Sequence, residues 1–151
     1  MGHRLPAAPM SASLDQLPDG QILALDDHRV TQLLVELRAV RLLTYSLGDA
    51  VELRVGVPFT VEQADGEPRR VNPSEPEQLA PLLTLVGRRA EVLRMATDGA
   101  LTAGFSDGTV LRVAPHPREE AWQLQGAGGL EGLAYACPPG GGPPWERPRR
   151  R

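Results

Sequence analysis

The chain has 151 residues, of which 41% are hydrophobic but only 4% aromatic, and its formal net charge is −3. This length suffices for one domain, whose core must consist mainly of Leu, Val and Ala side chains. The negative charge argues against a general nucleic-acid-binding surface, and a single cysteine, Cys137, excludes an internal disulfide. No apolar run approaches the ~18 residues of a membrane-spanning helix, and we find no apolar signal-peptide segment. We therefore expect a cytoplasmic protein.

Residues 1–20 are rich in Pro, Ala and Ser and show no hydrophobic periodicity. Such a composition is typical of a disordered N-terminal arm. We expect the folded domain to cover residues 21–138.

The first half of that domain carries the alternation typical of β-strands. Val51, Leu53 and Val55 alternate with Glu52 and Arg54, which predicts a half-buried antiparallel strand. Other strands are expected at 29–37, 40–46, 59–62 and, briefly, 69–71.

One short helix is expected over residues 74–84. Ser74 and Glu77 form a capping-box pattern, and the apolar residues that follow recur at helical spacing. Pro81 removes one backbone hydrogen bond, so the helix should be short or kinked.

Residues 85–129 predict four consecutive strands. Asp98-Gly99 and Asp107-Gly108 lie between alternating runs, a strong hairpin signal. Pro115 and Pro117 then interrupt pairing, and a last strand resumes at Glu120.

The two halves of the sequence resemble each other. Residues 25–46 align with 85–106 at an offset of 60, and the segments ending Leu53-Arg54-Val55 and Leu111-Arg112-Val113 align at an offset of 58. We therefore predict a mainly β fold with pseudo-repeats at 25–72 and 85–138. Two such antiparallel meanders, connected by the short helix, can pack as a sandwich or close as a small barrel.

Residues 139–151 form a Pro/Gly/Arg tail, whose composition predicts disorder. A more specific interpretation is a short linear motif, in which Trp145 anchors the tail while its arginines contact an acidic partner or phosphates. Four arginines are a weak nucleic-acid signal on an acidic chain.

The densest group of functional side chains lies at 116–122. Arg118, Glu120 and Trp122 are the candidate interaction residues, although a core role for Trp122 is favoured. Adjacent carboxylates on a strand face opposite ways, so Glu119 and Glu120 do not form a catalytic pair. We assign no catalytic residue.

No metal or cofactor site is predicted. Asp26, Asp27 and His28 are consecutive and cannot all converge on one metal, and no second histidine cluster completes a zinc site. Cys137 ends an apolar strand and is expected to be a buried, unreactive thiol.

The motifs of residues 85–142 resemble those of a family of small uncharacterised actinobacterial proteins. The resemblance rests on the two Asp-Gly turns, on Glu120-Ala121-Trp122-Gln123-Leu124 followed by the glycines of 126–129, and on Cys137 to Gly141. Glu119 replaces the aromatic residue that the family pattern has before Glu120. The family is a domain of unknown function, so the resemblance supports the fold and a bacterial origin without implying an activity.

Two functions from different classes are open at this point. One is a non-enzymatic protein-interaction protein, of which a toxin-neutralising immunity protein is a concrete form. The other is a small β-barrel that holds an apolar metabolite as a carrier or a cyclase. A filled interior would favour the first, and a cavity lined with a polar group would favour the second.

Overall fold

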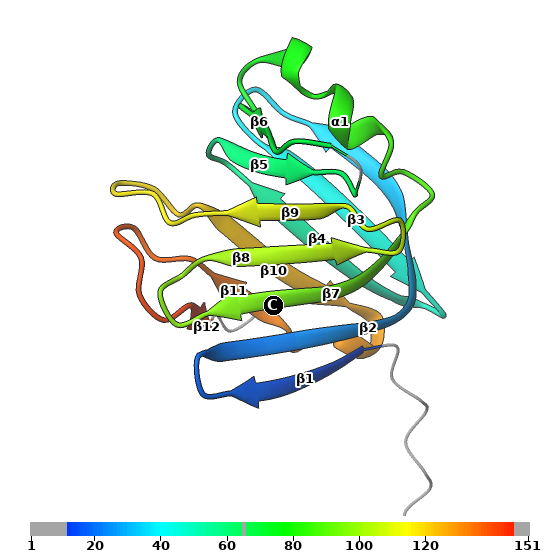
Figure 1. Cartoon of the computed structure of the whole chain (residues 1–151). Coiled ribbons are helices and arrows are strands. Elements are labelled where there is room, and N and C mark those ends of the chain that lie inside the picture. The colour runs from blue at the N-terminus through cyan, green and yellow to red at the C-terminus, as the bar shows by residue number, and fades with distance from the viewer. Residues whose placement is uncertain (1–11, 65, 147–151) are drawn as a thin grey trace, which may run out of the picture.

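The computed structural model describes residues 12–64 and 66–146, which form a mainly β structure (Figure 1). Its strands are β1 (Ala12–Leu17), β2 (Gly20–Val35), β3 (Val40–Ser46), β4 (Asp49–Val55), β5 (Phe59–Glu62), β6 (Arg69–Val71), β7 (Arg89–Ala96), β8 (Leu101–Phe105), β9 (Val110–Val113), β10 (Trp122–Ala127), β11 (Ala134–Ala136) and β12 (Trp145–Glu146). The helical elements are the 3-10 turns η1 (Pro76–Gln78) and η2 (Gly128–Leu130) and one short helix, α1 (Ala80–Leu83). No helix within these ranges is long and apolar enough to cross a membrane.

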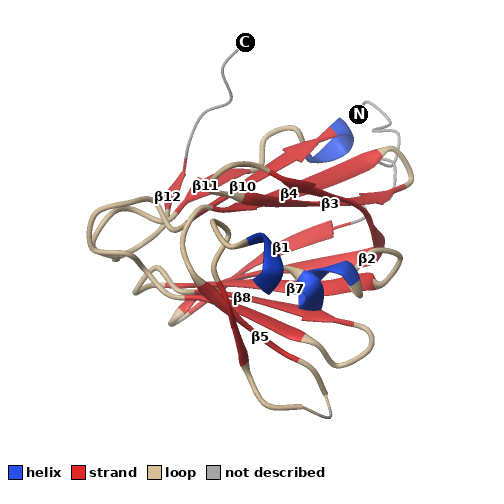
Figure 2. Ribbon diagram, turned by 90° about the horizontal axis from the view of Figure 1, so that it is seen from above, coloured by secondary structure: helices blue, strands red, loops and turns tan. Residues whose placement is uncertain are grey.

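All strands belong to one antiparallel sheet that folds back on itself. The order is β12-β11-β10-β4-β3-β2-β7-β8-β9-β5-β6, and β1 also pairs with β2. Figures 1 and 2 show two layers, with β3, β4 and β10 in one and β7, β8, β9 and β5 in the other. The sheet is not closed, so the predicted mainly β meanders pack as layers, and the small barrel is excluded.

The 16-residue strand β2 connects the two layers of the sheet. Its first part pairs with β1 and β7, and its second part, from Arg29, pairs with β3. The change of direction lies where pairing to β7 is interrupted between Ala24 and His28. Asp27 has a φ of 53° there, a left-handed conformation that Asp adopts more readily than most residues.

His28 is buried directly after this bend. Its Nδ1 lies 3.0 Å from the hydroxyl oxygen of Thr44 on β3. Burial lowers the pKa of His28, against the opposing effect of the carboxylates of Asp49, Asp26 and Asp27. The folded protein therefore favours the neutral imidazole.

Two sets of strands take the same course through the sheet. β2, β3 and β4 form one meander and β7, β8 and β9 the other. After β4 the chain crosses to pair β5 with β9, and after β9 it crosses to pair β10 with β4. Arg29 of β2 pairs with Arg89 of β7, which lies 60 positions later (89 − 29). A common origin of the two sequence halves stays a prediction.

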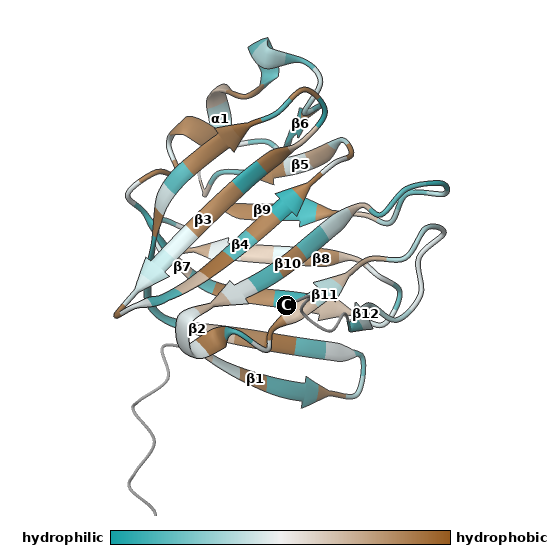
Figure 3. Cartoon of the chain, turned by 180° about the vertical axis from the view of Figure 1, so that it is seen from behind, coloured by the Kyte–Doolittle hydropathy of each residue, from teal (hydrophilic) through white to brown (hydrophobic). Residues whose placement is uncertain are grey.

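The core fills the space between the layers. The strands bury alternate residues, and Figure 3 shows hydrophobic and hydrophilic bands alternating along the back layer. Leu23, Leu101, Leu111 and Leu124 are among the fully buried side chains. A void of only about 20 Å³ lies among the core residues.

The N-terminal prediction is wrong for residues 12–20. Ala12–Leu17 forms β1, which pairs with β2 over six residues, and Ala12 is buried. The polar side chains of Ser13, Asp15 and Gln16 hide this strand in a composition-based prediction. Residues 1–11 of the predicted arm lie outside the described residues.

The tail prediction also needs correction, over residues 139–146. Trp145–Glu146 forms β12 against β11, and Gly142 N–H donates to the carbonyl of Asp98 at 2.9 Å. Trp145 is half exposed. Residues 147–151, with the four tail arginines, lie outside the described part of the chain.

The helix over 74–84 is shorter than predicted, and the capping box does not form. Glu75 has extended dihedrals and caps η1 without a side-chain hydrogen bond. Pro76 follows Glu75, and a residue before proline is disfavoured in helical conformation. The Ser74 N–H donates instead to the Asn72 side chain. η1 and α1 lie at the upper end of the molecule in Figure 1, where Leu79, Leu82 and Leu85 are buried.

We predict that His28 makes folding stability fall on mild acidification. Because the folded-state pKa of His28 lies below the unfolded value of about 6.5, its contribution is complete above that pH and is lost as the pH falls toward the folded-state pKa. The loss is limited to about 1.4 kcal/mol per pH unit. Urea denaturation between pH 7.5 and 5.5 should show a shallower pH dependence for His28→Gln than for the parent. Parallel curves for the two proteins would contradict the prediction.

Candidate functional site

Trp122 lies in the core at the start of β10, with an exposed fraction of 0%. Its indole Nε1 donates to the carbonyl of Gly99 at 2.8 Å, and its own carbonyl accepts from the Cys137 N–H at 3.0 Å. Gly99 is required there because its φ is +96° and a Cβ would lie 3.0 Å from the Cys137 Sγ. Trp122 thus joins the β7–β8 turn to the β10–β11 hairpin.

This position corrects one of the three predicted interaction residues. A side chain without exposed surface cannot contact a partner. Trp122 is therefore a core residue that packs beneath the loop carrying Arg118 and Glu120. Arg118 is exposed and Glu120 is half-buried. These two residues lie at the surface, where Glu120 also accepts a hydrogen bond from Gln123.

His116 holds the crossing loop between β9 and β10. Its Nδ1 accepts hydrogen bonds from the N–H groups of Arg118 at 3.0 Å and Glu119 at 3.2 Å. Its carbonyl accepts from the Gly140 N–H at 2.7 Å. By accepting both backbone N–H groups, the His116 side chain fixes the conformation of this loop.

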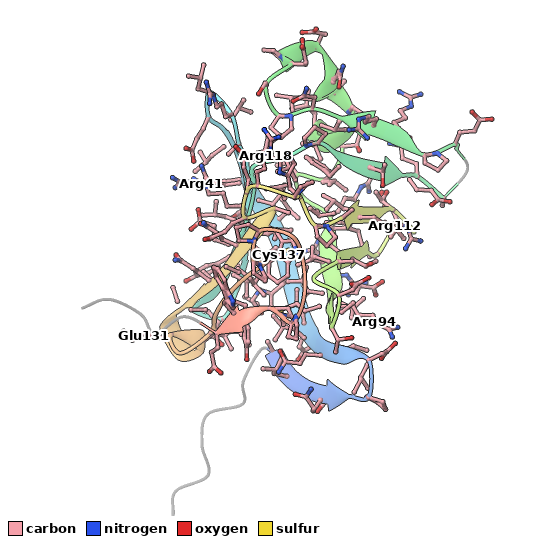
Figure 4. The ribbon with its side chains drawn as sticks, turned by 90° about the vertical axis from the view of Figure 1, so that its left-hand side faces the viewer. Arg41, Arg94, Arg112, Arg118, Glu131 and Cys137 are labelled. Atoms are coloured by element: carbon pink, nitrogen blue, oxygen red, sulfur yellow. The ribbon has the colours of Figure 1, made fainter. Side chains whose placement is uncertain are left out.

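Arg118 and Glu120 line an open groove of about 1070 Å³. Other walls come from the β2–β3 turn, the crossing from β4 to β5, and the segment after β6. The polar and charged lining residues are Arg38, Arg54, Asn72, Ser74, Arg118, Glu119, Glu120 and Gln123. Figure 4 shows Arg118 in the upper middle of the view, between the layer that carries Arg41 and the layer that carries Arg112.

The groove carries more positive than negative side chains. Arg38, Arg54 and Arg118 oppose Glu119 and Glu120 in its lining. The Glu120 carboxylate accepts from the Gln123 amide at 3.0 Å. Arg54 lies 3.8 Å from a carboxylate oxygen of Glu36.

A smaller polar depression of about 260 Å³ continues the groove across the outer face of β3, β4 and β10. Arg41, Glu52 and Gln125 line it with Arg54 and Gln123. Arg41 forms ion pairs with Glu36 and with Glu52, the latter at 3.3 Å. The charges of this depression are therefore largely neutralised by each other.

The groove is lined mainly by Arg, Glu and amide side chains. Its described lining contains no histidine or cysteine, and no hydrogen bond joins Ser74 to Glu119 or Glu120 among the contacts of the described residues. Cys137 is buried, and burial raises the pKa of its thiol. No group of three or more potential metal ligands lies together in the described ranges.

Sequence reasoning found Arg118 and Glu120 but not Arg38, Arg54 and Asn72. These residues are far apart in the sequence, and only the pairing of β10 with β4 brings Gln123 beside Arg54. The recurrence of Leu-Arg-Val at 53–55 and 111–113 includes Arg54, but it indicates a repeat and not a groove residue.

A family model matches residues 21–144, which is most of the chain. The chain belongs to DUF6188, a family of unknown function. No similar protein was found among characterised proteins or among solved structures. Membership in DUF6188 agrees with the resemblance to a domain of unknown function, whereas an actinobacterial origin stays a prediction.

We predict that Trp122→Ala lowers the free energy of unfolding by about 3–5 kcal/mol, the usual range for emptying a large aromatic site. Trp122→Phe is the matched control. It retains an aromatic ring but leaves the Gly99 carbonyl without the indole donor, and should cost about 1–3 kcal/mol. Urea denaturation followed by circular dichroism measures both. A Trp122→Ala variant that melts within about a degree of the parent would contradict a core role.

Proposed function

We propose that this DUF6188 protein is a non-enzymatic binding protein that engages another protein through the groove beside Arg118 and Glu120. The observation that carries the proposal is the contrast between a filled interior and this open groove of about 1070 Å³. The hydrogen bonds of His116 and the buried Trp122 hold the groove's central loop. Such support pre-organises Arg118 and Glu120 for contact and reduces the entropy lost on binding.

The lining suits a partner surface with carboxylate groups around an apolar contact. Arg38, Arg54 and Arg118 can each bind a carboxylate with two parallel hydrogen bonds. Leu37, which also lines the groove, is 87% exposed and offers an apolar contact at the rim. Charged residues around an apolar contact are typical of protein interfaces.

A toxin-neutralising immunity protein is the concrete form of this proposal. Such a protein acts by covering its target and needs no catalytic group. The small size, the net charge of −3 and the absence of a paired nucleophile and base in the described groove agree with that role.

The carrier or cyclase alternative depends on space inside the fold. Small-molecule pockets usually measure ~300–1,000 Å³, whereas the void among the core residues is about 20 Å³. A mostly apolar depression of about 370 Å³ beside Leu14, Leu133 and Tyr135 is large enough for a small ligand, but it is open to solvent and does not enclose one. The packing of the core therefore favours recognition at the surface, and we do not propose an internal ligand.

The test uses a quantitative binding assay with the protein that co-purifies most strongly with the full chain. We predict that Arg118→Ala/Glu120→Ala weakens that complex by about tenfold or more, as expected for central contact residues. Arg89→Ala/Glu91→Ala is the matched control, because it removes one exposed Arg and one exposed Glu two positions apart on β7. The control should bind like the parent.

Equal affinity for the parent and both double variants would contradict the groove as the binding site. Recovery of a stoichiometric apolar metabolite from the purified protein would contradict the proposed class of function. If the protein is an immunity protein, the parent must also inhibit the activity of the captured protein. The Arg118→Ala/Glu120→Ala variant must then fail to inhibit it.

A further inference from the structure

The outer face of the second layer carries a row of alternating Arg and Thr side chains. Arg94 of β7 pairs with Thr102 of β8, and Thr102 pairs with Arg112 of β9. Arg112 pairs in turn with Thr60 of β5, and Thr60 with Arg70 of β6. Directly paired residues of an antiparallel sheet project from the same face. We call these five residues the Arg–Thr row.

Small side chains flank the Arg–Thr row on one side. On β7, β8 and β9, the residues two positions away from the row on this side are Val92, Gly104 and Val110, and they are also paired with one another. Gly104 contributes no side chain at all. The arginines therefore project from a flat surface, and Figure 4 shows Arg94 and Arg112 on this side of the molecule, opposite Arg41.

The row's positive charge is only partly neutralised. Arg94 forms an ion pair with Asp19 at 2.5 Å, while Arg112 lies 4.0 Å from Glu62. Arg70 is exposed and forms no ion pair within the described ranges. On the opposite face, by contrast, Arg41 contacts both Glu36 and Glu52.

The spacing of the arginines matches that of a helix. Neighbouring strands lie about 4.8 Å apart, so Arg94, Arg112 and Arg70, two strands apart from one another, should be about 10 Å apart. Residues seven positions apart on a helix are separated by about 10.5 Å along its axis. Carboxylates at this spacing could meet all three arginines together.

We propose that the Arg–Thr row binds an acidic helix of a partner protein, lying across the strands with Asp or Glu side chains seven residues apart. The proposal rests on the registered spacing of the arginines, on Arg70, which has no ion pair within the described ranges, and on Arg112, whose ion pair with Glu62 is long at 4.0 Å. Thr60 and Thr102 place hydroxyl groups between the ion pairs. A protein partner is favoured over nucleic acid because Asp19 and Glu62 border the row and the whole chain is negatively charged.

The probe is a labelled helical peptide of about 21 residues with three glutamates at intervals of seven, compared with the same peptide carrying glutamines. Fluorescence anisotropy should detect binding of the glutamate peptide at low salt, weakened by added salt. Arg70→Gln/Arg112→Gln should reduce the affinity by about tenfold. Arg38→Gln/Arg118→Gln, which removes the same charge from the groove, should change it less than twofold.

Three outcomes would overturn the proposal: equal binding of the two peptides, equal loss in the two double variants, or tighter binding of a duplex DNA oligonucleotide than of the glutamate peptide. Chemical-shift mapping on the parent protein gives a readout that needs no variant. The glutamate peptide should shift amides of β5, β8 and β9 and leave β4 and β10 unchanged, and the reverse pattern would also overturn the proposal.

Discussion

The structure depends on the backbone pairing of β2 with three other strands. β1 and β3 follow one another along one edge of β2, while β7 occupies the other edge. In the order of the described strands, β2 thus connects the two layers. Because the strand bends at Asp27, the apolar faces of its two flanks are turned toward each other and exclude water from a common core.

This arrangement confines recognition to the outside of the molecule. The chain crosses from one layer to the other after β4 and crosses back after β9. The two crossing segments lie next to each other near Trp122. Arg118 and Glu120 then lie over a buried support, while the outward residues of β7, β8, β9, β5 and β6 form a second, separate surface. Both surfaces exist because each layer buries one face and exposes the other.

Much of the fold follows from local patterns in the sequence. Alternation at Val51, Leu53 and Val55 and the two Asp-Gly turns predict strands and hairpins that the structure contains. β1 could not be predicted, since only Ala12 of this strand is buried in the core and its other side chains show no apolar alternation. The predicted start of the helix at Ser74 was wrong, because a residue before proline is disfavoured in helical conformation and this restriction before Pro76 outweighs the capping pattern of Ser74 and Glu77.

The candidate site was less predictable than the fold. Proximity in sequence linked Arg118, Glu120 and Trp122, but β10 begins at Trp122, which is buried in the core, whereas Arg118 and Glu120 lie in the preceding loop. Arg38 and Arg54 join the groove only through long-range pairing. The Arg–Thr row was equally hard to predict, because its members lie on five different strands and only the pairing register aligns them.

Amide hydrogen exchange tests the central role of β2 most directly. The account predicts that paired amides in β2, β3 and β7 exchange only through global unfolding, with the full free energy of unfolding, whereas those of β6 and β12 at the sheet ends exchange through local opening at lower cost. Exchange of the β2 amides at a markedly lower free energy than those of β4 or β8 would contradict it.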